Sequence, residues 1–262
     1  MAEPEASGRI IGTSIPRREI RRLAHGGGRY TDDFDMARMV HVAFVRSPHA
    51  HARILSIDVD SAAGMAGVVR VVTGADIAEV CTPLVAVAAN RPGHKSAPQH
   101  VMAIGTTFWQ GEPVAAVVAV SRAVAEDAAE LVFVDFEPLV AVVDMDEALA
   151  PESPVIHPDL GDNLAFAHVI EAGSGTAPFD GADVVVEHTF DFGRQTAVTL
   201  EPRTIIADYS PADETLTVHQ SHQSPFQMQD IYCRHLAIDE HKVRVICPDV
   251  GGGFGLKINV HG

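Results

Sequence analysis

The sequence predicts an α+β protein, and three features of its 262 residues support that fold class. Short runs of branched apolar residues, typical of β-strands, recur between turn-forming residues. Two segments, residues 122–132 and 225–236, have the apolar spacing of helices that bury one face. Strands and helices do not alternate strictly as in a parallel βαβ protein, so the pattern favours separate sheets with helices packed on them.

The first 38 residues form a separate predicted unit, an N-terminal arm (residues 1–38). They are rich in Gly and Arg and only weakly periodic, with arginines clustered at residues 17–22 and three glycines at 26–28. We therefore expect an extended segment laid across a neighbouring domain or a partner. The arginines could contact an anionic group. We predict instead that they lie on a solvated surface, the usual environment of a charge run.

The first predicted domain covers residues 39–150 and begins with short strands. We expect strands at 40–45, 54–59 and 68–72, with a short helical segment at 61–65. Prolines interrupt every apolar run between residues 81 and 110, so a long connection with short strands is expected there.

The clearest unit of this domain lies at residues 114–136. The continuous apolar run at 114–120 predicts a strand buried on both faces. Ser121 is placed to cap a helix that begins at Arg122, and the apolar positions of that helix, including Leu131, share one face. We expect the helix to pack on the sheet, followed by a strand at 132–136 and a short closing helix at 144–150.

Residues 151–181 are the predicted linker, because prolines and glycines are abundant there. The second predicted domain covers residues 182–262 and contains four expected strands. They lie at 184–190, 204–209, 215–220 and 243–247. The second and third of these should form a hairpin, because Pro211 lies in the short turn between them.

A helix is expected to start at Pro225, because Pro favours the first helical position. Ser224 is the predicted N-cap and Gln227 completes a capping box. Gln223 then lies at a strand end, immediately before a helix N-terminus, where unpaired amides favour an oxygen-rich ligand. The alternative is that this polar side chain only contacts solvent.

The last expected strand leads into a glycine loop, residues 251–255, that holds four glycines in five positions. Pro248 stops the strand because it cannot donate to the ladder. Glycines allow positive φ and a close approach of a ligand to the backbone, and consecutive amides can converge on an oxyanion. A hairpin or bulged turn is the alternative. The spacing around Lys257 matches neither a Walker A loop nor the dinucleotide fingerprint.

The composition indicates a globular protein that does not bind nucleic acid or membranes. Hydrophobic residues make up 47% and charged residues 21%. The formal net charge of −16 opposes binding to phosphate backbones and anionic membranes. No apolar run reaches the roughly 18 residues that a membrane-spanning helix needs, and the first residues lack the apolar core of a secretory signal. We therefore expect a cytoplasmic location.

The cysteines predict neither a disulfide framework nor a metal cluster. Cys81, Cys233 and Cys247 are far apart and show no Cys-x-x-Cys spacing. Reduced, buried thiols are expected.

Several blocks of sequence, in order, resemble the molybdopterin-binding large subunit of the xanthine oxidase and aerobic carbon monoxide dehydrogenase family. The blocks in the first half resemble that family's α/β-hammerhead domain, and those in the second half resemble its first molybdopterin-binding domain. The blocks are residues 28–33, 44–52, 72–76, 111–115, 200–203, 216–225 and 243–257. The resemblance covers roughly residues 8–262. It implies a hammerhead domain followed by the beginning of a molybdopterin-binding domain.

The resemblance implies a molybdenum hydroxylase, which oxidises a carbon of a small molecule with oxygen from water. It implies a molybdenum–molybdopterin cofactor, in bacterial members commonly the cytosine dinucleotide form. In split bacterial enzymes of this family FAD lies on a medium subunit and [2Fe-2S] clusters on a small subunit, and both are expected as partners here. The lack of cysteine clusters in this chain fits that division.

The resemblance also assigns candidate site residues. Gln223 matches the family glutamine whose amide hydrogen-bonds the apical oxo ligand, and Gly252, Gly253, Phe254 and Gly255 match the loop whose amides approach the same centre. Neutral donors held in place for an oxygen ligand would act by electrostatic preorganisation. No protein side chain need ligate the metal. The histidines at 219, 222, 235 and 241 fit no zinc spacing and are expected to be structural.

Two departures from the family pattern limit this assignment. Purine-oxidising members carry a substrate-binding Glu directly after the Lys, where this chain has Ile258, so the resemblance to xanthine oxidisers is weakened. The family's general-base glutamate belongs to a C-terminal half that should follow residue 262, and Glu201 does not take that role merely by being nearby. No catalytic residue is assigned.

We conclude from the sequence that the chain is the N-terminal part of a molybdenum hydroxylase large subunit, inactive alone. Another chain could supply the C-terminal half in a split enzyme. The rival hypothesis is a non-catalytic assembly or binding module that keeps the fold. Carbon monoxide, aldehydes and N-heterocycles remain open as substrates.

Overall fold

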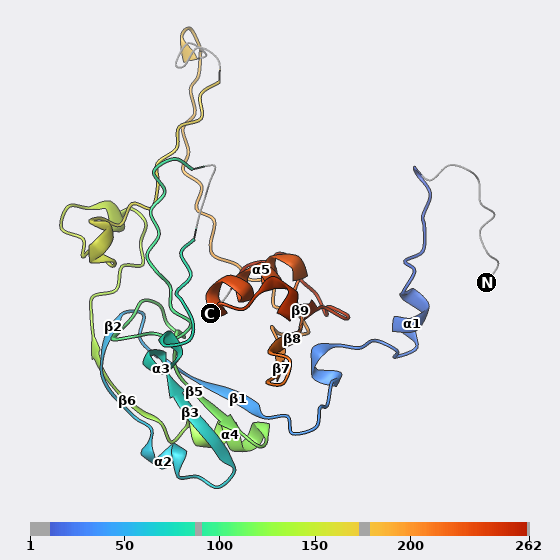
Figure 1. Cartoon of the computed structure of the whole chain (residues 1–262). Helices are drawn as coiled ribbons and strands as arrows, with labels where there is room; N and C mark the ends of the chain where they lie inside the picture. The colour runs from blue at the N-terminus through green and yellow to red at the C-terminus, as the bar shows by residue number, and fades with distance from the viewer. Residues whose placement is uncertain (1–10, 87–90, 173–178, 261–262) are drawn as a thin grey trace.

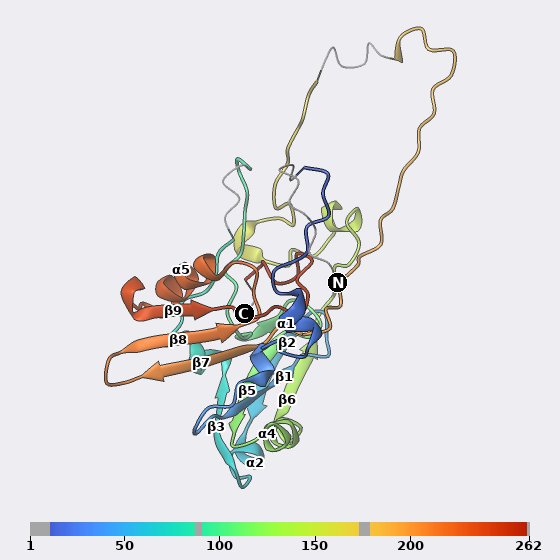
Figure 2. The same cartoon turned by 90° about the vertical axis from the view of Figure 1, so that its right-hand side faces the viewer.

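The computed structural model describes residues 11–86, 91–172 and 179–260. Two bodies are visible in Figure 1, one formed by β1–β6 with α2–α4 and the other by β7–β9 with α5. Between them residues 167–172 lead far out from both bodies and residues 179–198 lead back toward them, as Figure 2 shows. The α+β class predicted from the sequence is confirmed.

The first body contains two three-stranded antiparallel sheets. In the first sheet the order is β1-β5-β3, with β5 in the centre. In the second sheet the order is β4-β2-β6. The strands are β1 (His41–Arg46), β2 (Ala52–Asp58), β3 (Val68–Thr73), β4 (Thr106–Thr107), β5 (Pro113–Ala119) and β6 (Phe133–Pro138).

The core of this body lies between β5 and the helix that follows it, α4 (Arg122–Ala129). Ala115 and Val117 on β5 are fully buried, as the continuous apolar run predicts, and pack with Ala128 on α4. Ser121 caps α4 as expected, its Oγ accepting from the Val124 amide at 3.3 Å. The predicted inward position of Leu131 is wrong, since α4 ends at Ala129 and the Leu131 side chain is exposed.

Short helices complete the first body. Thr73 caps α3 (Gly74–Ala78), which the sequence did not predict, in a reciprocal capping box with Asp76. The closing helix expected at 144–150 is only a 3₁₀ turn. The remaining short helices are α2 (Asp60–Ala63), η2 (Glu147–Leu149) and η3 (Pro158–Leu160).

The second body is a three-stranded sheet with one covering helix, in the order β7-β8-β9. The predicted hairpin pairs β7 (Ile205–Ser210) with β8 (Thr215–Gln220) in antiparallel fashion. β9 (Val243–Ile246) is parallel to β8, so the chain must cross over between them, and α5 (Pro225–Leu236) makes that crossover. Figure 2 shows α5 lying along this sheet. The turn η5 (Glu240–Lys242) precedes β9.

The N-terminal arm is not extended throughout. It contains the helix α1 (Ile20–Ala24) and the turn η1 (Thr31–Asp33), and its residues 1–10 lie outside the described part of the chain. Of the linker predicted at 151–181, residues 173–178 likewise lie outside it.

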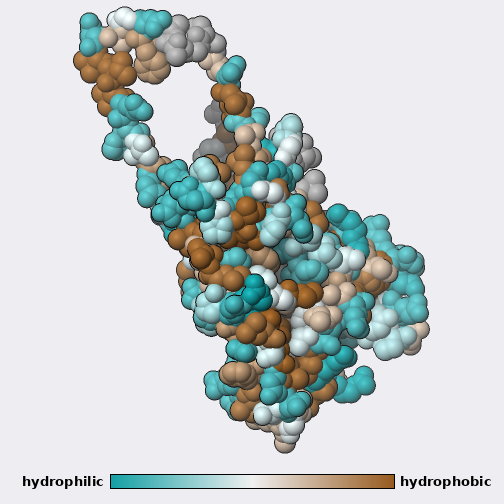
Figure 3. Space-filling model, turned by 90° about the vertical axis from the view of Figure 1, so that its left-hand side faces the viewer, coloured by the Kyte–Doolittle hydropathy of each residue, from teal (hydrophilic) through white to brown (hydrophobic). Residues whose placement is uncertain are grey.

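The strand predicted at 184–190 is wrong. Every residue of the excursion (residues 167–172 and 179–198) is exposed, and none of them belongs to a strand. The apolar pattern there is that of a strand, but a strand needs a partner for its backbone hydrogen bonds, and the described chain supplies none. Figure 3 shows hydrophobic side chains along this segment. They include Val184, Val185, Val186, Phe190 and Phe192.

The three cysteines are unpaired and only partly buried. Among the helices in the described ranges, none is long and apolar enough to cross a membrane.

Candidate functional site

The glycine loop follows β9 and has a backbone that most side chains would not tolerate. Gly252 has φ of 99°, in the region that glycine adopts readily. Phe254 has φ of 50°, which is uncommon for a residue with a side chain, and its ring is largely exposed. Such conformations persist where the surroundings fix them, and they cluster at functional sites.

The structure brings Gln223 directly against this loop. The Gly255 amide donates to Gln223 Oε1 at 3.2 Å. A Cβ built on Gly253 would lie 2.6 Å from Gln223 Cδ, so only glycine leaves room for the carboxamide. The backbone N–H of Gln223 also donates to the Lys257 carbonyl at 2.8 Å, which fixes the main chain at Gln223. Because Oε1 is engaged, Nε2 is the group that remains to donate to a ligand.

A buried cluster, which we call the clasp (Glu201, Ser221 and Lys257), holds the loop from behind. Lys257 is fully buried, and its Nζ donates to Glu201 Oε2 at 3.0 Å and to Ser221 Oγ at 2.7 Å. Ser221 Oγ in turn donates to Glu201 Oε2. The same carboxylate oxygen accepts from the Gly251 amide at 2.7 Å. The clasp therefore ties together the end of β8, the glycine loop and the chain returning from the excursion.

Charge compensation explains why a lysine can be buried here. Burial alone would raise the pKa of Glu201, but hydrogen bonds from Ser221, Gly251 and Lys257 lower it overall, so the carboxylate is ionised beside the ammonium. Buried charges are rarely found without such a partner. Glu201 is thus engaged in holding the loop, and the structure gives it no position as a general base.

One arginine of the N-terminal arm, Arg22, binds Asp249 just before the loop, whereas the other arginines of the run, Arg17, Arg18 and Arg21, are exposed as expected. Arg22 makes a bidentate ion pair with Asp249, at 2.7 Å and 2.6 Å. The Arg29 amide donates to the same carboxylate at 2.7 Å, and the Asp249 amide donates to the Arg29 carbonyl at 3.1 Å. The Arg22 hydrogen bond is the main reason that the pKa of Asp249 falls to about 2.

Three histidines of the second body contact neighbouring groups. His222 Nδ1 accepts from the Ser224 amide at 3.0 Å, the His219 ring lies tilted against the Phe34 ring, and His235 Nδ1 lies 3.0 Å from Thr82 Oγ1. Within the described ranges, no three or more His, Cys, Asp or Glu side chains are grouped to hold a metal ion. The capping role predicted for Ser224 is wrong, because its side chain makes no cap hydrogen bond. The His222 ring binds the Ser224 amide instead.

Sequence reasoning predicted the residues that meet at this site but missed those that hold them. Gln223, Gly253 and Gly255, three of the predicted cofactor-binding residues, lie against one another. Their role in binding a cofactor stays a prediction. The clasp and the Asp249 ion pair were not predicted. One signal was present, since Lys257 lies between Leu256 and Ile258, an apolar setting that suggests burial.

Two protein-family models match most of the chain. Residues 25–140 match the a/b hammerhead domain of aldehyde oxidase and xanthine dehydrogenase. Residues 156–262 match the molybdopterin cofactor-binding domain. The glycine loop, Gln223 and the clasp all lie in the second match.

Individual relatives extend this similarity. The chain is 36% identical to the nicotine 6-hydroxylase large subunit of Paenarthrobacter nicotinovorans, over 98% of this chain and 31% of that protein. It is 34% identical to the carbon monoxide dehydrogenase large chain of Afipia carboxidovorans, over 98% of this chain and 33% of that protein. Quinoline 2-oxidoreductase from Pseudomonas putida 86 superimposes with a TM-score of 0.86 at 40% identity, covering 95% of this chain and 32% of that chain. The chain spans about a third of the length of these relatives.

Proposed function

The chain belongs to the molybdopterin-binding large-subunit family of xanthine and carbon monoxide dehydrogenases, and on that premise we propose that it is the N-terminal part of a molybdenum hydroxylase large subunit. One observation carries the proposal: the Gln223 carboxamide and the glycine loop, 32 positions apart in sequence, meet at one place. In this proposal the chain contributes neutral hydrogen-bond donors to a cofactor site that other parts of the enzyme complete.

The residues present fit a molybdenum–molybdopterin group. The absence of a Cβ at Gly253 leaves the space that Gln223 occupies, and Gln223 Nε2 remains to donate toward the cofactor. When bound, the group supplies the oxidation that adds an oxygen atom from water to a carbon of a small-molecule substrate.

The chain's own residues bind and orient that group. Gln223 and the loop amides are neutral donors, and they need no reorganisation if they are already held in place. The clasp supplies that rigidity, because Glu201 fixes Gly251 while Lys257 fixes the backbone of Gln223.

We further propose that the cofactor is the cytosine dinucleotide form, and that FAD and [2Fe-2S] clusters reside on medium and small partner subunits in the cytoplasm. Two of the relatives are named as a large subunit and a large chain, which supports an enzyme of several chains. The C-terminal half of the family's large subunit would supply the general base and the substrate pocket.

The central test is Gln223→Ala in the complete assembly. Loss of one preorganised donor should lower turnover by about 10²–10³-fold at unchanged molybdenum content. Gln227→Ala is the matched control, because Gln227 is an exposed glutamine on α5 and should leave turnover unchanged. Full turnover of Gln223→Ala at full molybdenum content would remove the role proposed here.

Metal analysis separates this proposal from a non-catalytic assembly module. The chain purified with its co-expressed partners should contain molybdenum and a pterin if it contributes to a cofactor site. A module that only holds partner subunits would contain neither.

A further inference from the structure

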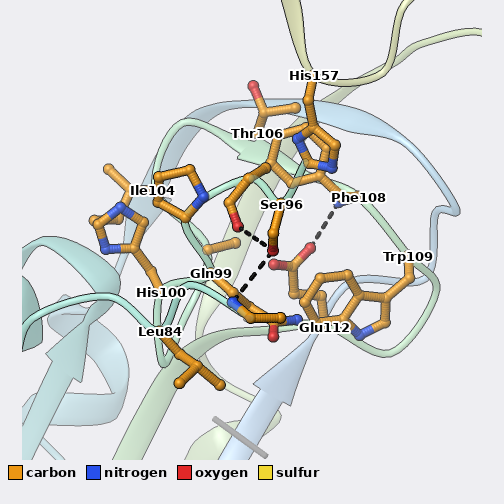
Figure 4. A pocket seen from close by; sticks show the side chains of 14 residues that line it. Leu84, Ser96, Gln99, His100, Ile104, Thr106, Phe108, Trp109, Glu112 and His157 are labelled. Atoms are coloured by element: carbon orange, nitrogen blue, oxygen red, sulfur yellow. Dashed lines mark hydrogen bonds between the residues drawn. The ribbon is translucent and has the colours of Figure 1, made fainter. Parts of the chain in front are cut away.

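The first body contains a second candidate site, a cavity of about 240 Å³ that lies apart from the glycine loop. Its walls come from the long connection between α3 and β5 and from His157, which lies on the segment leading to the excursion. Figure 4 shows the side chains of Ser96, Phe108, Trp109, Glu112 and His157 around this cavity. None of them belongs to the proposed cofactor site.

A buried carboxyl group forms part of the lining. Glu112 is only 4% exposed, and its Oε2 accepts from the Phe108 amide at 2.6 Å. The Glu112 backbone is fixed as well, since its carbonyl accepts from the Ser47 amide at 2.9 Å. The pKa of Glu112 is raised overall, because the effect of burial exceeds that of the hydrogen bonds from the Phe108 and Trp109 amides, which lower it.

Aromatic rings flank this carboxyl group. The centroid of the Phe108 ring lies 4.4 Å from that of the His157 ring and 5.8 Å from that of the His51 ring. The Trp109 indole forms another wall and is partly exposed. Aromatic faces attract cations, most strongly when the cation is also removed from water.

The described lining supplies no lysine or arginine partner for Glu112, although His100 and His157 also line the cavity. None of the described residues that line the cavity is Lys or Arg, and no ion pair of Glu112 is found among the described residues. A buried carboxylate is usually paired with a cation. The chain as a whole carries a charge of −16, which raises the local concentration of cations.

We propose that this cavity binds a small flat organic cation, such as an aromatic amidine, with its charge at Glu112 and its ring between Phe108 and Trp109. The volume is below the range of drug-sized pockets and suits a single ring with one charged substituent. A planar amidinium can donate to the carboxylate while its ring contacts the aromatic walls. The site would operate independently of the molybdenum cofactor.

Trp109 makes the test direct, because it is the one tryptophan in the sequence. The probe is benzamidinium, added to the 262-residue chain while Trp fluorescence is recorded. We expect a saturable change, and at least about tenfold weaker binding of benzamide, its neutral isostere, because charge-assisted hydrogen bonds are the stronger ones. Equal binding of the two probes, or no saturable change, would overturn the proposal.

The matching variant is Glu112→Gln, which keeps the shape and removes the charge. It should weaken benzamidinium binding at least about tenfold, while Glu126→Gln, a change at an exposed glutamate on α4, should leave it unaltered. Unaltered binding by a folded Glu112→Gln chain counts against the site. The comparison of benzamidinium with benzamide needs no variant, so the proposal stays falsifiable if Glu112→Gln does not fold. Neither measurement depends on molybdenum, so failure here leaves the proposed function untouched.

Discussion

At the scale of single residues, the strongest consequences concern Glu201, which forms with Lys257 the most buried ion pair in the described residues. Glu201→Gln would leave the Lys257 ammonium buried without a counter-charge. Removing one partner of such a pair costs about 3–5 kcal/mol, so we expect a loss of that size in the free energy of unfolding, measured by urea denaturation. Glu214→Gln is the control, since Glu214 pairs with Lys242 at the surface and its loss should change the free energy of unfolding far less. Equal effects of the two substitutions would contradict the clasp.

Gly253 gives a second prediction at this scale. In Gly253→Ala the new methyl group would collide with Gln223 Cδ and Oε1, the flexible end of a side chain, so the carboxamide should move while the fold is kept. Turnover of the complete assembly should then fall toward that of Gln223→Ala. Gly193→Ala is the control, because a Cβ there meets nothing within 4 Å. Full turnover of Gly253→Ala would show that the position of the carboxamide does not matter.

At the scale of elements, the N-terminal arm is held on the second body by a charge that acid removes. The pKa of Asp249 is about 2 in the folded chain, below its ordinary value of 3.8, chiefly because Arg22 binds the carboxylate. Its contribution to docking of the arm is therefore complete above about pH 4 and is lost as the pH falls through about 2. The protection of the amides of residues 20–30 against hydrogen exchange, measured relative to the intrinsic exchange rate at each pH, should fall over that range.

Two variants test whether the Asp249 carboxylate holds the N-terminal arm in place. Asp249→Asn should show low protection of residues 20–30 already at neutral pH, and no further loss of protection between pH 4 and pH 2. Arg18→Ala serves as the control, because Arg18 is an exposed arginine of the same arm and its loss should leave the arm docked. An arm that stays protected in Asp249→Asn would mean that other contacts hold it.

Elements with a strong local pattern could be predicted from the sequence. The buried strand β5 and the crossover helix α5 follow from an apolar run and from Pro225 at the first helical position. The arm could not be predicted in the same way, because the fate of Arg22 depends on Asp249, which lies 227 positions away. The clasp depends likewise on a contact between Glu201 and Lys257 across 56 positions. Such long-range pairs have no local signal.

At the scale of the whole molecule, the excursion is the part that the described chain leaves without a partner. Its sequence has the apolar content of a strand, yet its backbone makes no sheet and its side chains lie in solvent. A monomer rarely exposes a contiguous apolar surface of this kind. Unpaired strand-like segments are also templates for pairing with another chain.

We therefore expect the 262-residue chain alone to self-associate in sedimentation velocity experiments, through the excursion. Replacing Val184 and Val186 together by Lys should shift the chain toward monomer, because charges oppose edge-to-edge pairing. The matched control is the same double change at Val140 and Val143, two exposed valines outside the excursion, which should leave the association intact. A wild-type chain that sediments as a compact monomer at every concentration would contradict the prediction, since the apolar side chains of the excursion would then have to be covered within a single chain.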